Sequence, residues 1–427
     1  MSRLIIQGGH RISGVHRSPG NKNAALPMLT AALLTDEAVT LENVPIIDDV
    51  KTTLAQLEKL GVEVALDVPN RRVRLQAGKL RSSRLDKMLC DKVRSAILFA
   101  GPLLARLGRA TICQPGGDLI GRRRVDTHIN GLRALGATVA LRNGYAFRTR
   151  GLVGADILMD ESSVTATENL LMAAALAQGS TTLYNAACEP HVQNLCRMLN
   201  AMGASISGIG TNRLTIDGVE RLHGAVARIG ADYIDAGSYL TAAVVTGGIL
   251  TIEGIDAEDF AVLEGPFRKF GVKWSIQDGT LTLPAGQKLR TAYDFGDAIP
   301  KIEDGPWPSF PSDLMSILIV LATQTRGTTL FFEKMFESRM YFVDHLISMG
   351  ARIVQCDPHR VVVTGPATLH GTSVSSPDIR AGIALVIAAL AAKGESNILN
   401  AGSIDRGYED VVVRLSALGA KIKRSDT

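Results

Sequence analysis

An apolar pattern that contains a glycine recurs six times along this chain of 427 residues. Each copy follows the order hydrophobic, glycine, small residue, any residue, hydrophobic, as in LRALGATV and LSALGAKI. A glycine at this place predicts the left-handed end of a helix, and the residues after it predict a strand. The glycines are separated by 67 to 79 residues, and they are Gly61, Gly136, Gly203, Gly271, Gly350 and Gly419.

A second matched segment lies 20 to 25 residues before each glycine and predicts a strand that follows an apolar helix, as in LMAAALAQGSTTL. Each unit is thus predicted as strand–helix–strand–helix–strand–strand, with parallel pairing through right-handed crossovers. A single sheet of that size rarely forms, so two similar α/β domains of three units are expected, with a ligand cleft between them. The matched residues are Thr40, Thr111, Thr182, Thr251, Thr329 and Asn397.

Composition narrows the class of protein. The net charge of +4 is too small to argue for nucleic acid. The five cysteines are scattered and form no CxxC pair, which favours neither a zinc site nor a disulfide framework and points to the cytoplasm. The uncharged stretch 236–252 is short and interrupted by glycine, so it predicts a buried helix and a strand rather than a membrane span. The N-terminus does not resemble a signal peptide.

The second unit is the longest, and its excess lies in the segment CQPGGDLIGRRRVD at 113–126. Pro115 and three glycines predict a loop rather than a regular element. Packing does not require this loop, so it is either a tolerated surface insertion or a functional segment. Three consecutive arginines and Asp118 favour function.

Cations at three places are not explained by the repeat. Lys22 follows the turn SPGN before an apolar helix, and Arg406 is expected at the start of the last helix. A cation opposes the positive end of a helix, so a bound anion would explain both, although Lys22 could be an ordinary solvated lysine. The run Arg122, Arg123 and Arg124 suits phosphate or carboxylate, or else forms a solvated face.

Asp313 follows three prolines in the segment PWPSFP and precedes an apolar helix. It is a candidate for a positioned general base, or alternatively for a helix N-cap. Asp378 and Arg380 lie near another expected helix start and add one more unexplained cation. The eight histidines are isolated, and no GxSxG, HExxH, GxGxxG or EF-hand pattern is present, so no metal is expected.

Six segments in this order resemble the enolpyruvyl transferases over essentially the whole chain: SPGNKNAALP, PGGDLIGRRRVDTHINGLRALGA, SSVTATENLLMAAA, FPSDL, MFESRM and DRGYED. The nearest branch of that family acts on UDP-N-acetylglucosamine in peptidoglycan synthesis. The resemblance implies two inside-out, barrel-like α/β domains of three βαβαββ units each, with the active site in the interdomain cleft. It places 22–231 in an N-terminal domain with a mobile loop 113–124, and 1–21 with 232–427 in a C-terminal domain.

The resemblance also implies the reaction. Phosphoenolpyruvate would bind through Lys22, Arg123 and Arg406. Asp313 would help to remove the proton of the sugar 3′-hydroxyl, and Asp118 would deliver a proton to phosphoenolpyruvate before phosphate leaves. No cofactor, nucleic acid or membrane partner is implied, and we expect a monomer or a weak homo-oligomer. The other substrate-binding residues that it implies are Asn23, Arg94, Arg124, Val125, Asp126, His128, Ser163, Val164, Thr165, Met335, Arg339, Asp378 and Arg380.

Asp118 stands where most members of this family carry cysteine. A free carboxyl group ionises near pH ~4 and a thiol near pH ~8.5, so the surroundings, such as a phosphate dianion, must keep this acid protonated. Three further positions differ from the residues usual in the family's nucleotide site or hinge: Thr165, Arg124 and Tyr233. The resemblance therefore supports the type of reaction more strongly than the identity of the acceptor substrate. Two alternatives stay open: a transferase for another nucleotide sugar, and a paralogue that binds sugar nucleotide without turnover.

Overall fold

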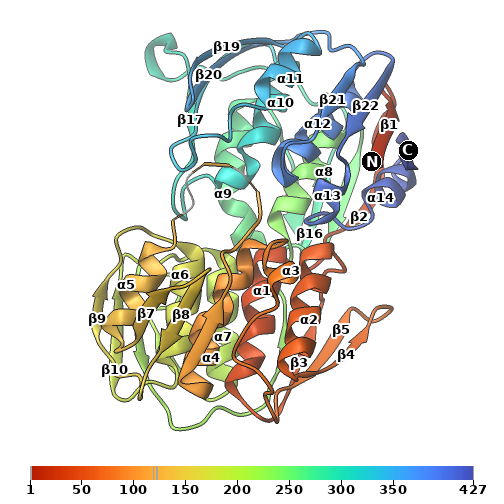
Figure 1. Cartoon of the computed structure of the whole chain (residues 1–427). Coiled ribbons are helices and arrows are strands. Elements are labelled where there is room, and N and C mark those ends of the chain that lie inside the picture. The colour runs from red at the N-terminus through yellow and green to blue at the C-terminus, as the bar shows by residue number, and fades with distance from the viewer. Residues whose placement is uncertain (1, 119, 122–123, 427) are drawn as a thin grey trace. The chain divides into compact units, whose positions relative to one another are not determined.

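The chain forms two compact units in its computed structural model, which describes residues 2–118, 120–121 and 124–426. Unit 1 holds the described parts of 1–19, 118–123 and 231–427. Unit 2 holds 20–117 and the described part of 124–230. Over the described residues the strands form six small sheets, three in each unit (Figure 1).

Unit 2 contains three of these sheets, and the strands of each are named in their spatial order. The first consists of β13 (Val226–Arg228), β3 (Ala38–Glu42), β5 (Arg72–Gln76) and β4 (Glu63–Asp67). The second consists of β6 (Arg109–Ile112), β8 (Tyr145–Arg148) and β7 (Thr138–Leu141). The third consists of β11 (Ser205–Ser207), β12 (Arg213–Asp217), β10 (Ser180–Tyr184) and β9 (Asp156–Leu158).

The helices of unit 2 divide into a buried set and an amphipathic set. Helices that are apolar all round need to be covered on every side, whereas an amphipathic helix buries one face. The buried set packs together and consists of α1 (Lys22–Ala31), η1 (Ala32–Leu34), η2 (Arg94–Phe99), α4 (Ala100–Leu107) and α6 (Val164–Ala174). The outer helices are α2 (Asp48–Leu60), α3 (Lys87–Cys90), α5 (Asp126–Ala134) and α7 (Pro190–Ala201).

Unit 1 repeats this arrangement with three four-stranded sheets. The first consists of β21 (Ser373–Ser375), β22 (Glu395–Leu399), β1 (Ser2–Gln7) and β23 (Lys421–Asp426). The second consists of β15 (Ser275–Gln277), β16 (Thr280–Leu283), β14 (Leu250–Glu253) and β2 (Gly14–Arg17). The third consists of β17 (Lys301–Glu303), β18 (Gly327–Phe332), β20 (Arg360–Gly365) and β19 (Arg352–Asp357).

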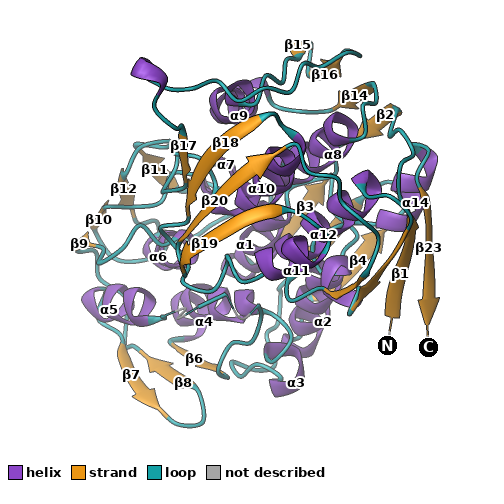
Figure 2. Cartoon of the chain, turned by 90° about the horizontal axis from the view of Figure 1, so that it is seen from above, coloured by secondary structure: helices purple, strands orange, loops and turns teal. Residues whose placement is uncertain are grey.

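Three apolar helices form the centre of unit 1 and pack against one another: α8 (Tyr233–Val245), α10 (Met315–Gln324) and α12 (Ile379–Ala391). Figure 2 shows β18, β20 and β19 side by side next to α10. The remaining helical segments are α9 (Ala257–Lys269), η3 (Phe295–Asp297), η4 (Ser312–Leu314), α11 (Val343–Ser348), α13 (Gly402–Asp405) and α14 (Val411–Ala417). Helices inside and sheets outside confirm the predicted α/β class with three units per half.

The repeat glycines and their matched strand residues lie where the pattern predicted them. All six glycines have positive φ, between 78° and 102°, at the ends of helices. Each matched residue lies in a strand: Thr40 in β3, Thr111 in β6, Thr182 in β10, Thr251 in β14, Thr329 in β18 and Asn397 in β22. The uncharged stretch 236–252 forms most of α8 and the start of β14, as predicted.

Two strands pair outside their own repeat. β2 precedes α1 and β3 in the chain, yet it pairs in parallel with β14 of unit 1. β13 precedes α8 and β14, yet it pairs in parallel with β3 of unit 2. Each unit therefore receives the first strand of one repeat from a distant part of the sequence.

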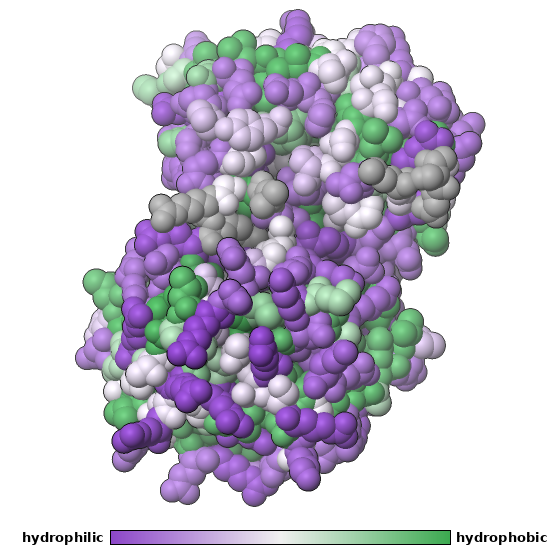
Figure 3. Space-filling view, viewed as in Figure 1, coloured by the Kyte–Doolittle hydropathy of each residue, from purple (hydrophilic) through white to green (hydrophobic). Residues whose placement is uncertain are grey.

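The surface in the view of Figure 3 is mostly hydrophilic, and its hydrophobic residues form separate patches. Within the described ranges, no helix is both long enough and apolar enough to span a bilayer.

Candidate functional site

Asp313 lies between two buried arginines of unit 1. Its Oδ1 accepts a hydrogen bond from Arg339 Nη2 at 3.1 Å, and its Oδ2 accepts one from Arg380 Nη2 at 2.8 Å. The arginine side chains are about 6–7% exposed, whereas that of Asp313 is 25% exposed. Asp313 is the second residue of η4 and makes no capping bond, so the N-cap alternative is wrong. Two guanidinium groups favour the ionised carboxylate, which is the form that a general base needs.

Arg380 is held in place from several directions. Asp378 caps α12 by accepting hydrogen bonds from the backbone N–H groups of Arg380 and Ala381. Arg380 lies 5.7 Å from the centre of the Tyr408 ring, and the Tyr408 hydroxyl is within 2.9 Å of Ser238 Oγ. Burial opposes the charge of Arg380, but Asp313, followed by Tyr408 and Asp232, outweighs burial and raises the pKa of the guanidinium. Arg380 is thus a fixed positive charge.

Asp118 and Arg406 form a close ion pair within unit 1, between Oδ1 and Nη1. Both side chains are largely shielded, with 18% and 23% exposure. The loop 113–124 was expected to belong to the N-terminal domain, but Asp118 clusters with unit 1, and Ser338 N–H donates to the Ile120 carbonyl at 3.2 Å. The predicted flexible loop contains neither helix nor strand in its described residues.

The prediction for Arg406 at a helix start is wrong. Arg406 is the C-cap residue of α13, a short helix that ends before α14 begins. Asp410 adopts a left-handed conformation with φ of 45°, which separates the two helices. A cation at the C-terminal end of a helix is favourable, so the helix dipole does not demand an anion here. The evidence on the role of Arg406 is therefore its ion pair with Asp118.

Lys22 is the first residue of α1 in unit 2, where the helix dipole opposes its charge. Asn21 caps this helix by accepting from the backbone N–H groups of Asn23 and Ala24. Lys22 Nζ lies 2.8 Å from Asp49 Oδ2, and both side chains are nearly buried. The buried carboxylate of Asp49 therefore supplies part of the counter-charge that the sequence assigned to a bound anion.

His128 is a neutral imidazole at the centre of a polar group in unit 2. Its Nδ1 lies 3.0 Å from Asn169 Nδ2, and its Nε2 lies 3.1 Å from Thr165 Oγ1. Burial, with Arg94 nearby, lowers the pKa of His128 to about 3. Because Asn169 donates to Nδ1, the Nε2 atom carries the hydrogen and donates toward Thr165. His128 thus offers a fixed hydrogen-bond donor rather than a charge.

Two arginines lie close to this imidazole group. Arg94 Nη2 donates to the Arg124 carbonyl at 3.1 Å, and burial lowers the pKa of Arg94. Arg124 Nε donates to Asp126 Oδ2 at 2.7 Å at the start of α5. Arg94, Arg124 and Asp126 are thus within a short chain of contacts in unit 2.

The other predicted site residues divide between the two units. In unit 2, Val125 and Ser163 are the N-cap positions of α5 and α6, Val164 begins α6, and Asn23 lies in the first turn of α1. In unit 1, Met335 is partly exposed and its N–H donates to Glu333 Oε1 at 3.2 Å. Arg123, predicted to bind phosphoenolpyruvate, lies outside the described residues, as does Arg122.

Sequence reasoning missed several groups that hold the predicted residues. In the sequence, Asp49 is an ordinary acid in the first turn of α2, and Asn169 is a polar residue directly before the apolar run LLMAA of α6. Tyr408 lies inside the segment DRGYED, where the sequence assigned it no role of its own. Only Asn169 gave a signal, because an amide next to an apolar run needs a partner when it is buried.

The described residues contain no cluster of three His, Cys, Asp or Glu side chains suited to a metal ion. The chemistry that they offer is acid–base and electrostatic. Unit 1 provides an ionised carboxylate held by two arginines, and a second carboxylate paired with Arg406. Unit 2 provides Lys22 and a neutral histidine beside a threonine hydroxyl. Fixed cations of this kind stabilise phosphate and other developing negative charge.

Comparison with known proteins gives consistent results. The family model described as EPSP synthase (3-phosphoshikimate 1-carboxyvinyltransferase) matches residues 6–415. The UDP-N-acetylglucosamine 1-carboxyvinyltransferase of Treponema denticola is 52% identical over 99% of both chains. The protein of the same name from Borreliella burgdorferi is 51% identical, again over 99% of both chains.

Solved structures share the fold. The enolpyruvyl transferase NikO from Streptomyces tendae superimposes with a TM-score of 0.90 at 24% identity, covering 100% of this chain and 99% of that one. EPSP synthase from Acinetobacter baumannii gives a TM-score of 0.76 at 16% identity, with both chains fully covered. At these identities the likeness concerns the fold.

Proposed function

Since the chain belongs to the EPSP synthase family, we propose that it transfers the enolpyruvyl group of phosphoenolpyruvate to the 3′-hydroxyl of UDP-N-acetylglucosamine, with release of phosphate. The relatives at about 50% identity that carry the corresponding name support this acceptor. The observation that carries the proposal is the pairing of Asp313 with Arg339 and Arg380. Two guanidinium groups favour the carboxylate form, and the reaction needs a base because it must begin at a weakly acidic hydroxyl.

The proposed reaction is an addition followed by an elimination. Asp313 accepts the proton of the 3′-hydroxyl while the oxygen forms a bond to C2 of phosphoenolpyruvate, and Asp118 delivers a proton to C3. The Asp118 carboxylate then takes back a proton from C3 of the tetrahedral adduct, and the C2–O bond to phosphate breaks as the phosphate leaves with the proton that Asp313 took from the hydroxyl. The overall change is one new C–O bond and one phosphate released. Two carboxyl groups with opposite protonation states are the requirement for this acid–base pairing.

The phosphate group is proposed to bind Lys22 and Arg406, together with Arg123. In the structure, Lys22 has the carboxylate of Asp49 as its partner, and Arg406 has that of Asp118. A phosphate dianion would compete with Asp118 for Arg406, because a guanidinium binds phosphate and carboxylate through the same donors. Asp118 released from Arg406 beside that dianion would take up a proton, since like charge disfavours the carboxylate. Binding of the substrate would thus prepare the proton donor.

The nucleotide is proposed to bind residues of unit 2. The donors available there are the hydroxyl of Thr165, which accepts from the Nε2–H of His128, the side chain of Arg124 and the first turn of α6 behind Ser163. The start of a helix favours an anion such as a diphosphate. Thr165 adds a hydroxyl where the family commonly has glycine, so this contact is a candidate for distinguishing among nucleotide sugars.

A phosphate-release assay with phosphoenolpyruvate and a panel of UDP-sugars tests the proposal. Release is expected with UDP-N-acetylglucosamine and not with UDP-glucose, and mass spectrometry should find the acceptor increased by one enolpyruvyl group. Calorimetry with and without phosphoenolpyruvate would show whether the sugar nucleotide binds. Release with a different sugar nucleotide would contradict the acceptor, and binding without release would contradict the transferase activity.

The epoxide fosfomycin is expected to leave this enzyme active and to form no adduct on Asp118. A thiolate opens the epoxide ring in relatives with a loop cysteine, whereas a carboxylate is a much weaker nucleophile than a thiolate. The check is phosphate release after incubation with fosfomycin, followed by peptide mass mapping of the loop. An adduct mass on Asp118 would show that the carboxylate is alkylated and would disprove this prediction.

A further inference from the structure

Two carboxyl groups are buried together behind Asp313. Asp304 follows β17 and Glu333 follows β18, and these two strands run in parallel side by side. Both residues are fully shielded from solvent, and they come directly after the paired strand residues Glu303 and Phe332, which places the two carboxyl groups next to each other. The proposed reaction uses neither of them. Two adjacent carboxylates without water are costly unless a proton or a cation compensates the charge.

The hydrogen bonds around the pair leave one carboxyl oxygen without a donor. Glu333 is surrounded by donors, because Ser312 Oγ donates to its Oε2 at 2.8 Å and two backbone N–H groups donate to its Oε1 at 3.2 Å. Asp304 Oδ1 accepts from Lys334 N–H at 2.6 Å. Among the described residues, no donor reaches Asp304 Oδ2. A buried carboxyl oxygen that has no donor, and whose neighbour is a second carboxyl group, is satisfied when one proton lies between the two groups.

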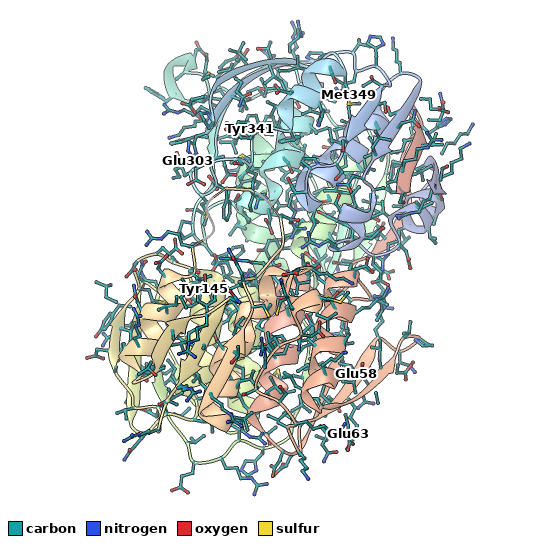
Figure 4. The ribbon with its side chains drawn as sticks, viewed as in Figure 1. Glu58, Glu63, Tyr145, Glu303, Tyr341 and Met349 are labelled. Carbon is teal, nitrogen blue, oxygen red and sulfur yellow. The ribbon has the colours of Figure 1, made fainter. Side chains whose placement is uncertain are left out.

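The charges of the neighbouring side chains are consistent with one proton on the Asp304–Glu333 pair. Arg339 Nε lies 4.0 Å from Glu333, and the same side chain binds Asp313, which also binds Arg380. Three carboxyl groups face two guanidinium groups, so a single proton makes this set neutral. The other titratable or charged groups on the surrounding elements are His359, whose Nδ1 is 2.7 Å from the Glu333 carbonyl, Asp232 and Asp378 near Arg380, and the surface pair of Lys334 with Glu303. Figure 4 labels Glu303.

We propose that Asp304 and Glu333 share one proton and act as positioning residues for Asp313. The inference rests on the proposed role of Asp313 as the base. Glu333 holds Ser312, the neighbour of Asp313 in the chain, and both Glu333 and Asp313 interact with Arg339. With one charge on the pair, Arg339 is shared between Glu333 and Asp313. Loss of the proton adds a second buried charge, which draws Arg339 toward the pair and weakens its hydrogen bond to Asp313.

The pKa of Glu333 sets the pH range over which the pair loses its shared proton. Burial, together with the hydrogen bond that protonated Glu333 can donate to Asp304, raises the pKa of Glu333 from 4.5 to about 8. The unfolded chain thus releases this proton at a lower pH than the native chain does. The stability that the shared proton contributes is complete below about pH 4.5, declines as the pH rises, and is lost once the pH passes about 8. We expect kcat to fall over the same alkaline range.

Asp304→Asn and Glu333→Gln form the test pair. In D304N the amide can donate to Glu333 in place of the proton, while its oxygen still accepts from Lys334 N–H. We expect D304N to keep kcat near neutral pH within about threefold and to lose the alkaline decline, because the pair can no longer change charge. In E333Q an amide faces Ser312 and Arg339, so we expect kcat to fall by about 30-fold with little change in KM. Asp304→Ala, which cannot donate, should lose about tenfold.

Infrared spectroscopy provides a readout that does not depend on turnover. The difference spectrum of wild type minus D304N should show the carbonyl band of a protonated carboxyl group at neutral pH, and this difference band should disappear as the pH passes about 8. Absence of that difference band, or equal loss of kcat in D304N and E333Q, would overturn the proposal. If E333Q fails to fold, the pH profile of D304N and the difference band decide. If no acceptor is turned over, the proposed function fails, whereas the band still decides whether the proton is shared.

Discussion

Asp313→Asn is expected to lower kcat for phosphate release by about 10³-fold, with a much smaller change in KM. The amide keeps the shape of the side chain and can still accept from one arginine, but it cannot take the proton of a hydroxyl group. Arg339 and Arg380 remain in place as buried cations. The residues proposed to bind phosphoenolpyruvate and the nucleotide are unchanged, so binding of both should be retained. Steady-state phosphate release with varied acceptor measures both parameters.

Loss of folding has to be separated from loss of the base in this variant. Removing one partner of a buried ion pair is destabilising, and because Asp313 is partly exposed we expect a cost of about 2 kcal/mol in the free energy of unfolding. Asp294→Asn is a matched control, since it removes an exposed aspartate that pairs with Lys269 in the same unit. D294N should retain kcat. If D313N is folded and loses less than about tenfold, Asp313 is not the general base.

The repeating part of the fold could be predicted because each copy carries its own local signal. The end of each helix itself requires a positive φ at Gly61 or Gly419. This helix end can therefore be predicted from the sequence without knowledge of the tertiary structure. The pairing of β2 with β14 and of β13 with β3 could not be predicted in the same way. The two short strands satisfy the same local pattern, and only the tertiary structure shows which neighbour each one joins.

The candidate site shows the same division. Asp313 and Lys22 could be found because a charged residue stands at an apolar helix start, where local packing does not explain it. The partner of Lys22 could not be found, because Asp49 is distant in sequence and looks like an ordinary surface charge there. The sequence singled out Arg380 as an unexplained cation but did not show that it pairs with Asp313. For Arg406 the interpretation as a helix-start residue was wrong, because the turn around Asp410 divides the expected helix into two.

Substitutions of Asp118 should give the second largest effects, and the size of the effect should depend on whether the new side chain is an acid. In Asp118→Asn the side chain no longer has an acidic proton, and we expect kcat to fall by about 10²- to 10³-fold. In Asp118→Cys the side chain is again an acid, and we expect kcat to recover to within about tenfold of the parent. Both variants lose the carboxylate that pairs with Arg406, so the difference between them isolates the proton.

The Asp118→Cys variant should also acquire two properties that the parent lacks. Fosfomycin should inactivate it and add its mass to the loop peptide, because a thiolate at this position can open the epoxide. Its kcat should be retained to a higher pH than that of the parent, because a thiol holds its proton to higher pH than a carboxyl group does. The parent contains the same five native cysteines, so its peptide map controls for labelling elsewhere.

The pH–rate profile of Asp118→Cys shows whether residue 118 is the proton donor. If residue 118 protonates C3 of phosphoenolpyruvate, exchange of its acid group must move the pH at which kcat declines, whatever the effect on the maximum rate. A profile that coincides with that of the parent, in a variant that fosfomycin labels, would show that the loop side chain is at the reacting atoms without supplying the proton. Arg406 would then keep its proposed phosphate contact, and the acid would have to be sought among the other groups around phosphoenolpyruvate.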